Sequence, residues 1–508
     1  MASSADGNDS VENCAPIDRR AFLRTAGAGA AGLLGGAALA GSKRDNRGDH
    51  DRPPNFVVIF VDDMGYGDIE PFGSTVNDTP HLNRMASEGM KLTSFYVADS
   101  VCTPSRAALL TGCYPKRVGL ARGPNHAVLF PGDPEGLNQS EENLANILSQ
   151  EGYATGCFGK WHLGDQPAFL PTSQGFDYYY GIPYSNDMWP GHPRAGRGGI
   201  WNFPPLPVVR NGEVVDTVDD MQQQGLLCKK FTDEAVSFIR RHRDEPFFVY
   251  VPHAFVHHPR GARREFLERA GAEEELDWDA VAENPWSQRL RVRTKAQIAE
   301  VDWSVGQILQ TLRDLGLSSN TFVLFTSDNG GSRGCSNAPL RGGKGNPWEG
   351  GQREPTIAWW PGTVSAGVAC DELATTMDLF PTFAKLSGAA PGDLVIDGND
   401  ISNLLLKGSE AKTPTERFFY YQRDNLRAVR SGPWKLFANG RLYNLDEDIG
   451  EKHNVAKQHP EVVEQLRGYL EEARKDLGDG KDGPGCRPPG RVKNPEPLLT
   501  PTDYSKST

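Results

Sequence analysis

Short apolar runs recur along the chain, and each ends abruptly in polar residues. The runs are 55–61, 154–158, 247–251 and 321–325. Continuous runs rich in β-branched and aromatic residues are typical of strands buried on both faces of a sheet. Segments with apolar residues at helical spacing alternate with them, at 141–152, 230–243 and 295–315. This alternation predicts an α/β fold with a mostly parallel sheet.

The polar residues that follow these runs carry the candidate chemistry. Asp62-Asp63 follows the first run and Asp328-Asn329 follows the last. Ligands of parallel sheets bind at the carboxyl ends of the strands, so we expect these clusters to share one site. Three carboxylates and an amide oxygen are a hard donor set, suited to Ca²⁺ or Mg²⁺ rather than zinc.

Cationic and titratable side chains add to this candidate chemistry. The cations are Arg106, Lys160 and Lys344, with His162 and His257 as their titratable neighbours. Taken one at a time, each of these cations is expected to be a surface charge, and each histidine to be a structural residue with its hydrogen bonds satisfied. Together with a metal they would suit a multiply charged oxyanion such as sulfate or phosphate.

The stretch Ser100–Gly112 reads as the start of a helix. Thr103 suits the N-cap, Pro104 the first helical position and Gly112 a left-handed stop. Cys102 would then lie just outside the N-terminus, where free N–H groups favour an anion. Arg106 follows one turn later. A reactive cysteine, an anion site and a purely structural cysteine are all compatible with this pattern.

The remaining segments predict the domain organisation. Segment 172–215 is aromatic and rich in proline and glycine, which favours a pocket wall over a packed surface excursion. Short runs after residue 412 predict a small antiparallel sheet, followed by a helix at 460–477. We therefore divide the chain into a catalytic domain at 55–411, a C-terminal subdomain at 412–477 and a tail at 478–508.

The first 40 residues resemble an export signal rather than part of the fold. Arg19-Arg20 opens a twin-arginine pattern, and a small-residue apolar run continues from Thr25 to Ala40. We expect a cleaved twin-arginine (Tat) signal peptide at 1–40, in preference to an uncleaved anchor, and a linker at 41–54. Such a signal implies a bacterial protein exported in the folded state by the Tat machinery, hence periplasmic or secreted.

Composition excludes some classes of function. A formal net charge of −12 over 508 residues argues against nucleic acid as a partner. Seven of the eight cysteines would survive cleavage, and the six besides Cys102 allow three disulfides or a set of buried thiols. The absence of a Cys-x-x-Cys pair argues against a zinc ribbon.

Five motifs in order resemble the type I, formylglycine-dependent sulfatases. They are Cys102–Gly112, Gly159–Gly164, Asp328–Gly330, Leu340–Gly345 and Glu349–Pro355. The segment Gln174–Asp187 is similar to the arylsulfatase A subgroup, and the likeness extends from about Asn55 to Asn454. The resemblance implies an alkaline-phosphatase-like fold, with a mostly parallel mixed sheet flanked by helices and a smaller C-terminal antiparallel sheet plus helix.

The resemblance also implies a modified nucleophile and a metal. Cys102 would be oxidised to Cα-formylglycine by a formylglycine-generating or anaerobic maturation enzyme. One hydroxyl of the hydrated aldehyde would attack sulfur, with Asp328 helping to activate it. The second hydroxyl would then expel the bound sulfate as the aldehyde re-forms. Ca²⁺, with Mg²⁺ as the alternative, would be held by Asp62, Asp63, Asp328, Asn329 and residue 102.

Further roles are implied for the surrounding side chains. Arg106 and Lys160 would hold the hydrate, and His162 would assist release of the covalently bound sulfate. Lys344 and His257 would bind the sulfate and protonate the leaving alcohol, with Lys160 and Ser185 as additional sulfate contacts. His257 is preferred over His253 and His258 because it lies two residues before Pro259, as in the family.

The implied activity is hydrolysis of sulfate monoesters of aryl or sugar alcohols. Two alternatives are a formylglycine-dependent phosphonate monoester or phosphodiester hydrolase and a non-catalytic binder of sulfated glycans. Lys344 within Gly342–Gly345 favours sulfate, and the intact set around Cys102 argues against a binder. An aryl sulfate is the expected probe substrate and a sulfated saccharide the expected natural one.

Overall fold

The computed structural model describes residues 52–195, 201–271 and 288–499. The predicted signal peptide and most of the predicted linker at 41–54 lie outside these residues. No helix in the described part of the chain is both long and apolar enough to cross a membrane. The domain boundaries proposed at 411/412 and 477/478 stay predictions.

A large mixed sheet forms the centre of the fold, in the order β11-β2-β10-β9-β1-β8-β4-β5-β6-β7, with β12 also paired to β2. Its middle strands β9, β1, β8, β4 and β5 are all parallel, whereas β10, β6 and β7 pair antiparallel with their neighbours. The predicted α/β class is confirmed. The strands are β1 (Asn55–Val61), β2 (Met90–Tyr96), β4 (Ala154–Lys160), β5 (Tyr178–Ile182), β6 (Leu206–Arg210), β7 (Glu213–Val218), β8 (Phe247–Pro252), β9 (Thr321–Ser327), β10 (Arg353–Trp359), β11 (Val368–Cys370) and β12 (Ala374–Thr375).

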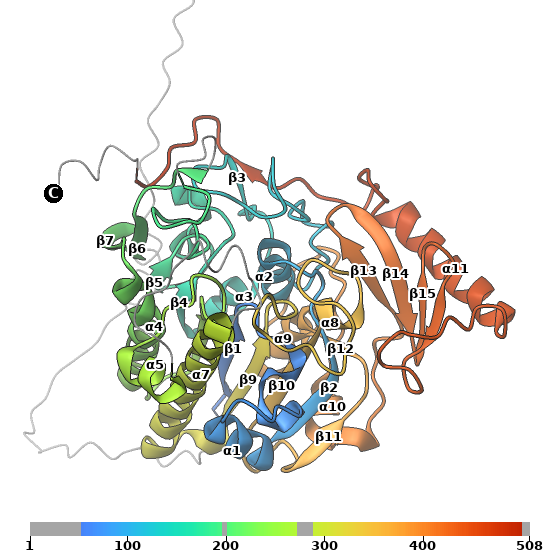
Figure 1. Cartoon of the computed structure of the whole chain (residues 1–508), viewed down its shortest axis with the longest axis horizontal. Helices are drawn as coiled ribbons and strands as arrows, with labels where there is room; N and C mark the ends of the chain where they lie inside the picture. The colour runs from blue at the N-terminus through green and yellow to red at the C-terminus, as the bar shows by residue number, and fades with distance from the viewer. Residues whose placement is uncertain (1–51, 196–200, 272–287, 500–508) are drawn as a thin grey trace, which may run out of the picture. The chain divides into compact units, whose positions relative to one another are not determined.

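Helices cover both faces of this sheet because successive side chains of a buried strand point to opposite sides. In β1, Val57, Ile59 and Val61 join one core, and Phe56, Val58 and Phe60 join the other. The first core is closed by α1 (Pro80–Glu88), α4 (Met221–Arg241), α5 (Arg264–Ala270) and α7 (Gln288–Asp314), of which α4, α5 and α7 stand together in Figure 1. The second is closed by α2 (Cys102–Thr111), α3 (Leu144–Gln150), α9 (Leu379–Ser387) and α10 (Ser402–Lys407).

The starts of several helices differ from the predictions. The predicted N-cap Thr103 is wrong: α2 begins at Cys102 after an extended Val101, and the Thr103 hydroxyl donates to the carbonyl of His162 instead. Gly112 does end α2 in the left-handed conformation, with φ of 69°.

The predicted bounds of α3, α4 and α7 also change. Helix α3 covers Leu144–Gln150 within the predicted 141–152, because the side chain of Asn143 caps its start. Helix α4 begins at Met221 rather than at residue 230, because the side chain of Asp220 accepts the N–H of Gln223 and nucleates the first turn earlier. Helix α7 extends over Gln288–Asp314.

Segment 172–215 is not a continuous loop. It contains β5, β6 and the beginning of β7. Aromatic and β-branched residues carry these strands, and β6 pairs antiparallel with both neighbours. The excursion that connects β5 to β6 spans residues 183–205, of which 196–200 lie outside the described residues.

The C-terminal part forms the predicted antiparallel sheet, composed of β13 (Phe418–Gln422), β14 (Asn425–Ser431), β15 (Trp434–Phe437) and β16 (Leu442–Asn444). Helix α11 (Pro460–Asp476) packs on it, and Figure 1 shows both in orange to red beside the central sheet.

The described part of the tail is anchored to the catalytic domain. β17 (Gly490–Arg491) pairs with β3 (Glu135–Gly136), and Arg487 forms an ion pair with Glu141. All seven cysteines from Cys102 onward are free thiols, five of them buried, so the predicted alternative of three disulfides is not adopted.

Candidate active site

The carboxyl ends of the parallel strands bring the predicted residues together. Asp62 and Asp63 follow β1, Asp328 and Asn329 follow β9, and Lys160 ends β4. All five are buried. Their common position follows from the topology, since β9, β1, β8 and β4 are adjacent parallel strands whose ends lie at one edge.

Carboxylates and the cysteine form a compact group of potential ligands. One ligand atom each from Asp62, Asp63, Cys102 and Asp328 lies within 4.8 Å of the others. Oδ2 of Asp63 and Oδ1 of Asn329 are buried and have no hydrogen-bond partner. Leaving such oxygens unsatisfied costs about 1–3 kcal/mol each. A hard cation would satisfy both oxygens, so these residues fit Ca²⁺ or Mg²⁺.

Two buried cations bracket the carboxylates. Nζ of Lys160 lies 2.6 Å from Oδ2 of Asp62 and 3.3 Å from Oγ of Ser185. Nη2 of Arg106 lies 2.7 Å from Oδ2 of Asp328, and its Nη1 donates to the carbonyl of Lys160. Arg106 is on the first turns of α2 and therefore ties the start of that helix to the ends of β4 and β9.

Lys344 approaches from the loop after β9. Its Nζ lies 2.6 Å from Oδ1 of Asp63 and 3.4 Å from Sγ of Cys102. The same thiol lies 3.5 Å from Oδ1 of Asp62. The cysteine is therefore surrounded by the charged groups rather than packed in an apolar core.

The candidate histidines His257, His253 and His162 differ in their position relative to this group. Nδ1 of His257 donates to the carbonyl of His258, which leaves Nε2 facing Asp63 at 3.7 Å from Oδ2. His253 is completely buried and hydrogen-bonded to Ser304, away from this group. His162, further along the loop after β4, contacts the carbonyl of Leu129 through Nε2.

The pKa values reflect burial and crowding of charges. Burial raises the pKa of Asp62, but Lys160, then His257 and Arg106, outweigh it and hold the pKa well below its ordinary value. Burial and the neighbouring Asp62 raise the pKa of Asp328 to about 7, against the attraction of Arg106. Burial raises the pKa of the Cys102 thiol as well. An unmodified Cys102 is consequently a protonated, weak nucleophile.

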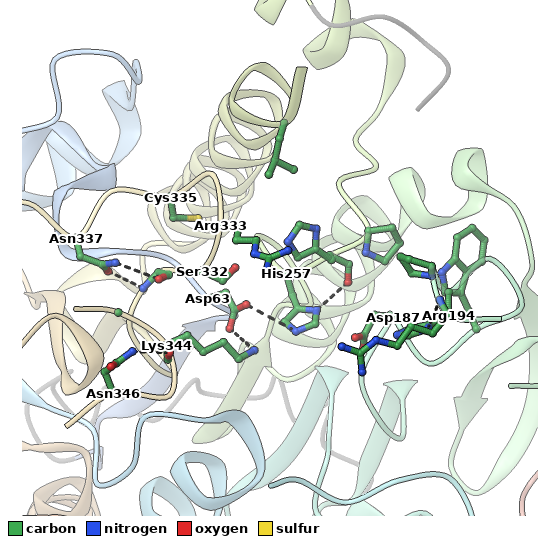
Figure 2. A pocket seen from close by; sticks show the side chains of 18 of the residues that line it. Asp63, Asp187, Arg194, His257, Ser332, Arg333, Cys335, Asn337, Lys344 and Asn346 are labelled. Atoms are coloured by element: carbon green, nitrogen blue, oxygen red, sulfur yellow. Dashed lines mark hydrogen bonds and ion pairs between the residues drawn. The ribbon is translucent and has the colours of Figure 1, made fainter. Parts of the chain in front are cut away.

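A cavity of about 810 Å³ opens above this group, with Asp63, His257 and Lys344 in its lining. Figure 2 shows Asp187 and Arg194 on one side of His257, and Lys344, Asn337 and Asn346 on the other. The expected pocket wall is confirmed for the 183–205 excursion, which supplies Asp187, Trp189, His192, Arg194 and Trp201. Sequence reasoning did not single out Asp187, Arg194, Arg333, Asn337 or Asn346. For Asp187 and Arg194, the aromatic composition of the 183–205 excursion was the feature of the sequence that could have indicated a role in the pocket.

Together, the parallel sheet, the buried carboxylates and the cations around a helix-start cysteine define a hydrolase for esters of charged oxyanions. The family model described as Sulfatase matches residues 54–389. Human (Homo sapiens) arylsulfatase A is 37% identical over 467 residues, covering 82% of this chain and 87% of that protein. N-acetylgalactosamine-6-sulfatase of Mus musculus is 39% identical over 402 residues, covering 76% and 72%.

A solved structure supports the same assignment. The structure of Ps i-CgsB in complex with k-i-k-neocarrahexaose has a TM-score of 0.71 and 28% identity, covering 83% of this chain and 92% of that one. The chain belongs to the sulfatase family and is a sulfuric ester hydrolase similar to arylsulfatase A.

Proposed function

We propose that this chain hydrolyses sulfate monoesters with a formylglycine derived from Cys102 and a bound Ca²⁺, with Mg²⁺ as the alternative ion. The observation that carries the proposal is the pair of unsatisfied oxygens on Asp63 and Asn329, buried among carboxylates beside Cys102. Such an arrangement is costly unless a cation is held there. The high pKa of the thiol also favours a nucleophile other than the thiolate.

Each side chain near residue 102 has a proposed task. Asp62, Asp63, Asp328, Asn329 and residue 102 would hold the ion, which when bound polarises the sulfate and the attacking hydroxyl. Arg106 and Lys160 hold residue 102 and its hydrated aldehyde in place through their positive charges. Asp328 is placed to receive the proton of the attacking hydroxyl.

The leaving side of the reaction is assigned to Lys344 and His257. Lys344 extends its ammonium to within 3.4 Å of Sγ of Cys102, where it can neutralise the transferring sulfate. His257 faces the same space with Nε2; because its Nδ1–H is donated to the carbonyl of His258, it protonates the leaving alcohol through Nε2 in its imidazolium form, which the neighbouring Asp63 favours. Ser185 and Lys160 provide further sulfate contacts, and His162 assists release of the bound sulfate.

A comparison of two small substrates tests the proposal. We expect the purified enzyme to hydrolyse para-nitrophenyl sulfate faster than bis-para-nitrophenyl phosphate. A chelator should abolish the sulfatase activity, and Ca²⁺ or Mg²⁺ should restore it, because the carboxylates lose the charge that they surround. Faster diester cleavage would instead assign the alternative hydrolase activity, and binding of sulfated glycans without turnover would assign a binder. Indifference to the chelator would contradict the metal site.

We further propose a sulfated saccharide as the natural substrate, with support from the saccharide complex of Ps i-CgsB and from the size of the cavity. Export by the Tat machinery and conversion of Cys102 by a maturation enzyme are part of the same proposal. The twin-arginine pattern at Arg19-Arg20 motivates the first and the Cys102–Arg106 motif the second. Cell fractionation of the source bacterium tests export: recovery only from the cytoplasm would contradict it.

A further inference from the structure

One wall of the cavity carries an arginine held on an aromatic platform. The ring of His192 stacks on Trp201, with centroids 4.9 Å apart and planes 12° from parallel. The guanidinium of Arg194 lies over Trp201, 4.5 Å from the ring centroid. Phe130 and Phe203 meet the same indole edge-on, with centroids 6.0 Å and 6.3 Å away. These contacts fix the indole and with it the position of the guanidinium.

Within the part of the chain that the structure describes, no residue accepts a hydrogen bond from the Arg194 guanidinium. Within the described residues Arg194 has no ion pair, although many arginines of this chain do, such as Arg106 and Arg117. A guanidinium is a planar fork that binds sulfate or carboxylate through two parallel hydrogen bonds. Arg194 is exposed, and because stacking on Trp201 already restricts its side chain, such a contact would cost less side-chain entropy than one made by an unrestrained arginine.

Arg194 lies in the same cavity as the proposed reacting centre. Arg194 and Lys344 line the same cavity, on opposite sides of His257 (Figure 2). Asp187 stands next to Arg194 in that view, and its Oδ1 is buried without a hydrogen-bond partner, which suits a sugar hydroxyl. A cavity of about 810 Å³ is far larger than a single sulfate requires.

We propose that Arg194, held on Trp201, binds a second anionic substituent, a sulfate or a carboxylate, on a saccharide whose scissile sulfate lies at Lys344 and His257. This inference rests on the proposed sulfate-ester hydrolysis and specifies its substrate class. The enzyme would accordingly prefer saccharides that carry one negative group besides the sulfate to be removed. Arg194 acts in substrate selection and takes no part in the chemical step.

Kinetics on matched saccharides test this subsite. We would measure kcat/KM for a monosulfated neutral disaccharide, for its disulfated analogue and for a monosulfated disaccharide with a uronate. The wild type should prefer one or both doubly charged substrates, and Arg194→Gln should reduce that preference by about ten-fold or more through KM. The two doubly charged substrates distinguish a sulfate from a carboxylate as the group bound. Arg194→Lys should retain part of the preference.

Two control variants separate a specific contact from general attraction. Arg333→Gln removes another cavity-lining charge, one that stacks on no aromatic ring among the described residues, and Arg467→Gln removes an exposed charge from α11. Neither should match the loss caused by Arg194→Gln, whereas Trp201→Leu should approach it. Equal losses in Arg194→Gln and Arg333→Gln, or no preference in the wild type, would overturn the subsite.

The proposed function can fail independently of the subsite. If the wild type does not hydrolyse para-nitrophenyl sulfate, the proposed activity is contradicted. Equilibrium binding of the same disaccharides to the wild type and to Arg194→Gln would then still decide the subsite. Equal affinities for the doubly charged saccharides would overturn it.

Discussion

Two clusters of buried charges in this chain contain similar residues but serve different purposes. The first is the group around Cys102, with Asp62, Asp63 and Asp328 facing Arg106, Lys160 and Lys344. The second, which we call the inter-sheet cluster, lies between the central and C-terminal sheets and consists of Tyr96, Glu349, Arg353, Tyr420, Arg430, Lys435 and Glu451.

The inter-sheet cluster satisfies its central carboxylate. Oε1 of Glu349 accepts from Tyr420 at 2.6 Å and from Lys435 at 3.0 Å, and Oε2 accepts from Tyr96 at 2.5 Å. Lys435 also lies 2.8 Å from Glu451. The cluster around Cys102 instead leaves oxygens of Asp63 and Asn329 unsatisfied and borders a cavity. Within the described residues the inter-sheet cluster leaves only Oε1 of Glu451 without a hydrogen bond, and that oxygen is ion-paired to Lys435. A cluster whose central carboxylate is fully paired holds the fold together, whereas one with free oxygens beside a cavity is prepared to bind.

The largest expected contrast comes from Cys102→Ala. Turnover of an aryl sulfate should fall by on the order of 10⁴-fold or more, because the nucleophile is lost. The free energy of unfolding should change by only about 1 kcal/mol, because a single buried sulfur is removed. Steady-state kinetics and denaturant unfolding of the same preparation check both values. Turnover near that of the wild type would exclude residue 102 as the nucleophile.

Lys435→Met should show the reverse behaviour. It leaves Glu349 and Glu451 buried without their ammonium partner, which should reduce the free energy of unfolding by about 3–5 kcal/mol. The kcat of the folded fraction should stay close to that of the wild type.

The matched control for Lys435→Met adds Glu349→Gln and Glu451→Gln to the same chain. Removing the stranded charges should recover part of the lost stability. The distinction between the clusters would be wrong if Lys435→Met folded stably and lost turnover.

A smaller effect on the free energy of unfolding is expected when the pH is lowered. Burial raises the pKa of Glu349, but Lys435 and Arg353 outweigh it and lower the pKa from 4.5 to about 2. The folded state therefore favours the charged carboxylate. Its contribution to stability is complete above the ordinary pKa and is lost as the pH falls from 4.5 towards 2. Unfolding measured across this window should be less pH-dependent in Glu349→Gln than in the wild type, and an equal slope would contradict the assignment.

The contrast also explains what the sequence could predict. Runs such as 55–61 predict a strand buried on both faces. The topology of the sheet then places Asp62 and Asp328 at the same edge, where the parallel strands end. The first residue of α2 could not be predicted in the same way. Thr103 has the side chain of an N-cap, but in the fold its hydroxyl is used by His162, 59 residues away in the chain.

The inter-sheet cluster and the role of Arg194 in the cavity wall could not be predicted from the sequence, for a similar reason. Glu349 and Lys435 are separated by 86 residues, and nothing local to either indicates the other. Arg194 gains its significance only from its place over Trp201 and from its lack of an ion pair among the described residues. Such long-range pairings are set by tertiary packing, whereas strand and helix periodicity are properties of the local sequence.

The state of residue 102 in active enzyme tests the central claim most directly. Mass spectrometry of the peptide that contains this residue should show the mass of an aldehyde in place of the thiol-bearing side chain of cysteine. The converted fraction should also rise in proportion to specific activity across preparations made with and without a maturation enzyme. Fully active protein in which residue 102 is an unmodified cysteine would contradict the account.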